Sequence, residues 1–156
     1  MIRNLTTGGI PVIRNLTKRT VLSYRTFQAV SFGDRLRGLI GRPFGRFGFD
    51  AMVFLSCSSI HTCFMTFPID VIFLGPENTV LKTCPGCRPW RPAVWCAGAV
   101  GVIELPDGAL SHTGTEVGDR LDLNAETVSP EERTQLSTHP QGEHGAVFPA
   151  KENSTV

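Results

Sequence analysis

Two acidic residues inside aliphatic runs are the first candidates for chemistry: Asp70 lies within 69–74 and Glu104 within 100–105. Burying a carboxylate is costly unless it is paired or hydrogen-bonded. Asp70 is therefore either a general base or ligand-orienting group in a pocket, or a structural group that accepts backbone N–H bonds from the preceding bend or pairs with an arginine. Strand alternation can place Glu104 on the solvent face with no role. If it points inward with Asp70, the two form an acid/base pair of the kind that hydrolytic chemistry uses.

A second candidate is the proline-rich segment that carries Arg88, Trp90 and Arg91. Proline fixes the backbone angle φ, so these side chains project from a stiff segment. The two guanidinium groups could bind a carboxylate or phosphate while the indole stacks on a sugar or on another ring of the ligand. In the alternative interpretation, Trp90 covers an open end of the core and one arginine neutralises Asp70 or Glu104.

The cysteines suggest metal or redox chemistry only weakly. Cys84 and Cys87 have the two-residue spacing of a zinc or disulfide pair, and Cys57, His61 and Cys63 could supply further ligands. That second group is not a compact ligand pair, and no strand–turn–helix context places Cys84 at the start of a helix, where redox cysteines lie. We expect ordinary thiols, no metal and no cofactor. His61 is then either a proton shuttle near Asp70 or a hydrogen-bonded histidine at a strand edge.

Composition restricts the partners. The formal net charge is +1 and 19% of residues are charged, which predicts neither nucleic-acid nor membrane binding. The longest nearly apolar stretch, 93–105, is too short to span a bilayer. Polar residues follow Arg3 where a signal peptide is apolar, so we expect a cytoplasmic protein. No Gly-x-Ser-x-Gly elbow, phosphate loop or nucleotide fingerprint occurs in the sequence.

The elements that must position these residues are mostly strands. A helix is expected near 33–41, because Ser31 and Asp34 resemble a capping box and apolar residues follow at helical spacing. The turn at 75–78 predicts a hairpin, and 84–92 reads as an irregular loop. Strands are expected within 19–30, 51–55, 60–65, 69–74, 79–83, 100–105 and 120–123.

The length of 156 residues suits one domain with one hydrophobic core. The pentapeptide Ile-Arg-Asn-Leu-Thr occurs at 2–6 and again at 13–17, so one copy is expected outside the fold. We predict a flexible N-terminal extension over 1–13, one small soluble domain over 14–124 and a disordered polar tail over 125–156.

Two segments, 35–42 (Arg-Leu-Arg-Gly-Leu-Ile-Gly-Arg) and 61–74 (His-Thr-Cys-Phe-Met-Thr-Phe-Pro-Ile-Asp-Val-Ile-Phe-Leu), closely resemble the domain of unknown function 192 family, DUF192. Segments 88–91, 102–108 and 117–121 match it in the same order. The resemblance implies an α+β domain built on a curved, barrel-like antiparallel or mixed sheet with one or two short helices. It implies no established activity.

These observations together favour a non-catalytic ligand-binding or accessory module that accepts a small polar or anionic ligand. The expected pocket combines the stiff basic loop with the two carboxylates and their neighbours: His61, Met65, Asp70, Arg88, Trp90, Arg91 and Glu104. A hydrolase or lyase that uses Asp70, Glu104 and His61 is the alternative, and a zinc-stabilised structural domain is the second alternative.

Overall fold

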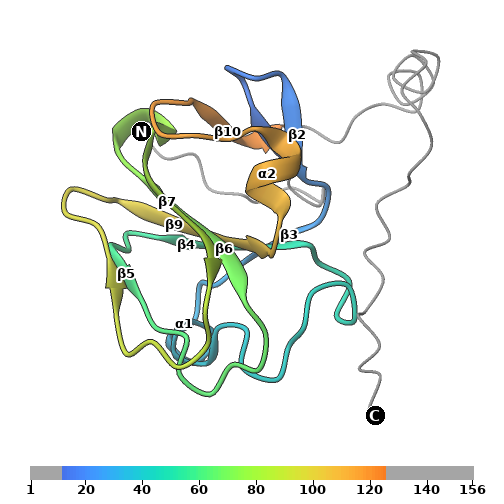
Figure 1. The fold of residues 1–156 in the computed structure, drawn as a ribbon, viewed down its shortest axis with the longest axis vertical. Coiled ribbons are helices and arrows are strands. Elements are labelled where there is room, and N and C mark those ends of the chain that lie inside the picture. The colour runs from blue at the N-terminus through green and yellow to red at the C-terminus, as the bar shows by residue number, and fades with distance from the viewer. Residues whose placement is uncertain (1–11, 126–156) are drawn as a thin grey trace, which may run out of the picture.

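Strands dominate residues 12–125, which are the part of the chain that the computed structural model describes (Figure 1). In chain order the elements are β1 (Val12–Asn15), β2 (Thr20–Ser23), β3 (Thr26–Gln28), α1 (Phe32–Arg37), β4 (Ala51–Leu55), β5 (Ser59–Ile60), β6 (Ile69–Leu74), the 3-10 turn η1 (Pro76–Asn78), β7 (Val80–Cys87), β8 (Val94–Trp95), β9 (Gly101–Pro106), α2 (Ala109–Thr113) and β10 (Leu121–Ala125). The fold is a strand-rich α+β arrangement with two short α-helices.

The strands form three sheets, with the orders β10-β1-β2, β3-β4-β9-β6-β7 and β5-β8. All pairs are antiparallel except β3 with β4, so the mixed sheet is confirmed. The barrel-like closure implied by the family resemblance is wrong, because the central sheet ends at β3 and β7, which do not pair with each other. The two faces of the open central sheet are therefore separate surfaces.

Each face of the central sheet carries its own hydrophobic core, because side chains alternate along a strand. Figure 1 shows β2, β10 and α2 on one side of the sheet and α1 and β5 on the other. The first core includes Ile72, Leu74, Ile103 and Leu105. The second core, on the α1 side, includes Leu39, Met52, Phe54, Ile60, Met65, Ile69, Val71, Phe73 and Val102.

The parallel pair β3–β4 determines the place of α1. A parallel connection must travel the length of the strands before it returns, and residues 29–50 do so with α1 in their course. The capping prediction is confirmed, since Ser31 Oγ accepts a 3.0 Å bond from the Asp34 N–H. The helix ends at Arg37, earlier than expected, because Gly38 (φ 50°) leaves the helical conformation and its N–H binds the Asp34 carbonyl.

Two local predictions are wrong. The segment 60–65 is not a strand: β5 ends at Ile60, and Phe64 takes a positive φ of 64° in a turn. The segment 84–92 is not wholly a loop, because β7 continues to Cys87. A register shift opposite Asp70 and an edge position in the sheet accommodate Pro85 there.

The predicted boundaries are largely untested. Strand β1 begins at Val12, within the last two residues of the expected extension. The remainder of that extension, and the expected tail beyond Ala125, lie outside the described residues. No helix of the described range has the length and apolar character needed to cross a bilayer.

Candidate ligand pocket

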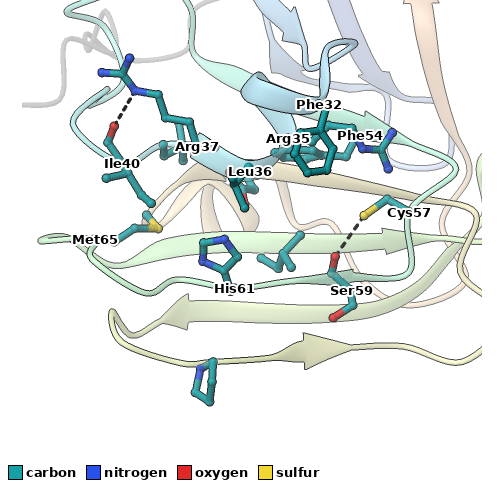
Figure 2. Close-up of a pocket in the computed structure, with 15 residues that line it drawn as sticks. Phe32, Arg35, Leu36, Arg37, Ile40, Phe54, Cys57, Ser59, His61 and Met65 are labelled. Atoms are coloured by element: carbon teal, nitrogen blue, oxygen red, sulfur yellow. Dashed lines mark hydrogen bonds between the residues drawn. The ribbon is translucent and has the colours of Figure 1, made fainter.

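A cavity of about 330 Å³ lies between α1, the segment after β5 and the central sheet (Figure 2). This volume is at the lower end of the range for small-ligand sites. The residues that line it come from sequence positions 32–104: Phe32, Arg35, Leu36, Arg37, Gly38, Leu39, Ile40, Phe54, Cys57, Ser59, Ile60, His61, Met65, Pro92 and Glu104. Three of the seven predicted ligand-binding residues are therefore brought together, namely His61, Met65 and Glu104.

The walls of the pocket are apolar because they belong to the core on the α1 side of the sheet. Leu39, Phe54, Ile60 and Met65 are all buried and line the cavity. Their side chains offer contact surface to an apolar group and no hydrogen bonds, so orientation of a ligand falls to the few polar atoms present.

Glu104 is the most buried of the polar lining residues. It is 3% exposed and stands in register with Met52 of β4 and Val71 of β6, so the interpretation that placed it on the solvent face is wrong. Its Oε2 atom is buried without a hydrogen-bond partner. Burial raises the pKa of Glu104 to about 8. The carboxyl group is therefore mainly protonated at neutral pH.

His61, which also lines the cavity, carries a second unpartnered polar atom. Its Nδ1 atom is buried and makes no hydrogen bond, so the interpretation as a hydrogen-bonded strand-edge histidine finds no support at that atom. Figure 2 shows the imidazole between Met65 and the α1 side chains, directed toward the cavity. Buried side-chain polar atoms are normally satisfied, so two unsatisfied ones on residues that line one cavity make this cavity the candidate site.

Arg35 and Arg37 also belong to the polar lining, and sequence reasoning missed both. Arg35 donates to the carbonyls of Leu55 (2.9 Å) and Ser56 (3.2 Å), which ties α1 to the end of β4. Arg37 Nε donates to the Ile40 carbonyl at 3.3 Å. Both arginines belong to the first segment that carries the family resemblance, so that motif was the available signal.

Asp70 lies on the opposite face of the sheet. It is opposite Leu105 in register and 1% exposed, and it faces the core that α2 covers. Its carboxylate accepts 2.8 Å bonds from the backbone N–H groups of Gly86 and Leu110. Asp70 therefore accepts backbone N–H bonds, as the structural interpretation expected, but from β7 and α2 and not from the bend that precedes it. The acid/base pair with Glu104 that a hydrolase or lyase would need is not formed.

The side chains of Arg88, Trp90 and Arg91 also lie outside the pocket lining, to which only Pro92 of the basic loop belongs. Arg88, Trp90 and Arg91 are exposed, and among residues 12–125 neither arginine forms an ion pair with Asp70 or Glu104. The Trp90 ring, 63% exposed, meets Phe64 edge-to-face at 5.1 Å between ring centroids. The role of this loop in ligand binding stays a prediction.

Thr62 holds the loop in place. The buried hydroxyl donates to the Arg88 carbonyl (2.8 Å) and accepts from the Arg91 N–H (3.0 Å), and the backbone N–H of Trp90 donates to the Thr62 carbonyl. We expect Thr62→Val to lower the free energy of unfolding by about 1 to 2 kcal/mol, because valine keeps the shape but leaves both partners unsatisfied. Urea denaturation measures this, with exposed Thr66→Val as the control. Equal stabilities of the two variants would contradict it.

The cysteines remain thiols in the described range. No three His, Cys, Asp or Glu side chains gather there as metal ligands, so Cys84 and Cys87 are not joined by the second group that the zinc alternative needs. Burial, with a further contribution from neighbouring Cys84, raises the pKa of Cys87 to about 11. A thiol with that pKa is a poor source of the reactive thiolate.

Comparison with known proteins agrees with this architecture. Residues 15–123 match the DUF192 model, described as an uncharacterized ACR. The chain belongs to the DUF192 family. A UPF0127 protein of Thermococcus sibiricus is 37% identical in an alignment of 128 residues, and the match covers 78% of this chain and 78% of the relative. A UPF0127 protein of Pyrococcus furiosus is 39% identical over 67 residues, covering 43% of this DUF192 chain and 57% of the relative.

Two solved structures share the fold of this DUF192 protein. A protein of unknown function from Novosphingobium aromaticivorans has a TM-score of 0.61 at 23% identity and covers 76% of this chain and 89% of its own. A putative transcription regulator from Sinorhizobium meliloti has a TM-score of 0.62 at 18% identity, with 75% and 97% covered. At these identities the likeness concerns the fold alone.

Proposed function

We propose that this DUF192 domain is a non-catalytic binding module whose pocket takes a small ligand with an apolar body and a polar group that reaches Glu104. The observation that carries the proposal is that two residues lining one cavity, Glu104 and His61, each have a buried polar atom without a partner, Oε2 and Nδ1. Leaving a buried polar group unsatisfied costs about 1 to 3 kcal/mol, so a ligand that supplies partners recovers that free energy.

The surface around the cavity supports the same proposal. Phe32 and Leu36 line the cavity from α1 and are 80% and 60% exposed. Helix α1 has six residues and buries none of them, whereas a helix this short is marginal without packing partners. An apolar ligand would cover both side chains and add the contacts that α1 lacks.

A thermal-shift screen of the full chain against sugars, nucleotides and organic acids tests the proposal. We expect at least one compound to raise Tm by several degrees, since a ligand at 100 times its Kd adds about 2.7 kcal/mol. The shift should persist in Arg91→Ala, which leaves the pocket lining intact, and disappear in Glu104→Leu. No shift with the wild type, or equal shifts in all three proteins, would refute the proposed function.

A further inference from the structure

The cysteine pair Cys84 and Cys87 lies on one face of the central sheet, although residues three apart along a regular strand point to opposite faces. Cys84 stands opposite Val71 of β6 and Cys87 stands opposite Ile69, so β7 has one residue more than β6 between the two pairs. This bulge reverses the alternation of side chains along β7. Both thiols therefore face the core on the α1 side, to which Ile69 and Val71 belong.

A buried carboxylate holds the bulge in place. Asp70 is 1% exposed, and its Oδ1 atom accepts a 2.8 Å bond from the Gly86 N–H. Gly86 takes a φ of 55°, a left-handed conformation that glycine adopts without strain, and Pro85 has no N–H to donate. The backbone between the two cysteines is thus fixed by the fold, and so is the placement of both thiols on one face.

The two thiols differ in exposure and interact with each other. Cys87 is 2% exposed, whereas Cys84 is half-buried on the edge strand and is the more accessible of the two. Burial, followed by the charge and the hydrogen bond of Cys84, raises the pKa of Cys87 to about 11, while the charge and hydrogen bond of Arg91 act in the opposite direction. The two sulfur atoms and the Arg91 guanidinium group therefore lie together.

We propose that Cys84 and Cys87 form a thiol–disulfide exchange site, which reacts with a low-molecular-weight disulfide and ends as an internal Cys84–Cys87 disulfide. In the first step the Cys84 thiolate attacks one sulfur of the substrate; a mixed disulfide forms, the substrate S–S bond breaks, and its electron pair leaves with the first thiolate. In the second step the Cys87 thiolate attacks Cys84 Sγ and displaces the second thiolate. The protons of the two cysteines pass through water to the two departing thiolates, so the cysteine pair is oxidised by two electrons and the substrate is reduced to two thiols.

The surroundings of the two thiols determine the order of these steps. A small disulfide can reach half-buried Cys84, whereas buried Cys87 meets only Cys84. Once Cys84 is bonded to the substrate it carries no charge, which removes one cause of the raised pKa of Cys87. Arg91 then remains to stabilise the Cys87 thiolate, a task that a helix start performs at other redox cysteines.

The exchange site is separate from the proposed ligand pocket. Neither cysteine of the pair lines that cavity, so the inference goes beyond the proposed function and does not depend on it. A failure of the thermal-shift screen would leave the exchange site standing, and a failure of thiol exchange would leave the pocket standing.

Incubation of the reduced full chain with oxidised glutathione, followed by alkylation of the remaining thiols and peptide mass spectrometry, tests the proposal. We expect the wild type to join Cys84 to Cys87, to release two molecules of glutathione and to keep none on either residue. Cys87→Ala should retain glutathione on Cys84, and Cys84→Ala should leave Cys87 as a free thiol. Cys96→Ala, a change at another half-buried cysteine, should behave as the wild type does.

The wild type alone can overturn the proposal, even if a variant fails to fold. Free thiols at both positions after incubation, glutathione retained on Cys84, or a bond from Cys84 to a cysteine other than Cys87 would each do so.

A second pair of variants tests the part that Arg91 plays. In a time course, Arg91→Gln should form the mixed disulfide on Cys84 at the rate of the wild type and keep it several-fold longer, because the charge beside Cys87 is lost. Glutamine preserves the backbone bonds that residue 91 makes to Thr62. Arg88→Gln, a change at an exposed arginine of the same loop, should alter neither step. Equal lifetimes of the mixed disulfide in the two variants would overturn the role of Arg91.

Discussion

Replacing Glu104 with glutamine is expected to stabilise the protein progressively as the pH rises. The pKa of Glu104 is about 8 in the folded chain against an ordinary value of 4.5, because the group is buried. Between these values the unfolded chain binds fewer protons than the folded one, so the wild type loses stability as the pH rises through this window. The advantage of glutamine should be near zero at about pH 4, about 3 kcal/mol at pH 7 and constant above about pH 8.

Denaturant unfolding of both proteins across this pH range measures the difference directly. Glu77→Gln is the matched control, because Glu77 is exposed and pairs with Arg120 in a surface salt bridge of small energetic value. Its difference from the wild type should change little with pH. Parallel stability profiles for the wild type and Glu104→Gln would show that the carboxyl group does not titrate abnormally.

The second large effect is expected at Asp70. Asp70→Ala should lower the free energy of unfolding by about 3 to 5 kcal/mol, because it removes two charge-assisted bonds and leaves the N–H groups of Gly86 and Leu110 unsatisfied. The bond to Leu110 also replaces a cap, since the N-cap residue of α2 is Gly108, which has no side chain. The carboxylate from β6 therefore holds the first turn of α2 and the bulge of β7 together.

Urea denaturation measures this loss, with Asp107→Ala as the control because Asp107 is exposed in the turn that precedes α2. Asp70→Asn should fall between the wild type and alanine, since an amide keeps one acceptor oxygen. A loss below about 1 kcal/mol in Asp70→Ala would mean that water or a backbone shift satisfies both N–H groups.

The local fold was predictable wherever neighbouring residues determine it. Gly75 and Pro76 specify the turn before β7, and Ser31 with Asp34 specifies the start of α1. The strand expected over 60–65 was wrong because a distant contact decides the backbone there. Thr62 bonds to residues 88–91, and an apolar pattern carries no information about such a partner.

The site was only partly predictable for a related reason. Burial of Asp70 followed from its apolar neighbours, whereas strand alternation placed Glu104 on the solvent face and was wrong. The face that each residue occupies depends on which elements cover each side of the sheet. Register places Glu104 beside Val71 and Asp70 beside Leu105, so one residue of offset sends the two carboxyl groups in opposite directions. Arg35 and Arg37 joined the pocket only because the β3–β4 connection passes over it.

Because α1 lies in the connection between β3 and β4, the chain cannot pair these two strands without also forming the α1 wall of the pocket. Since β4 runs in the same direction as β3, the polypeptide must double back across the sheet between them, and α1 lies on this return route. A shorter connection could not link β3 to β4, so the three-residue edge strand β3 and the α1 wall of the pocket would be lost together. Side chains along 32–40 can be exchanged to change this wall of the pocket, but the segment itself cannot be removed. A ligand that contacts this wall would therefore also stabilise the edge of the sheet at β3.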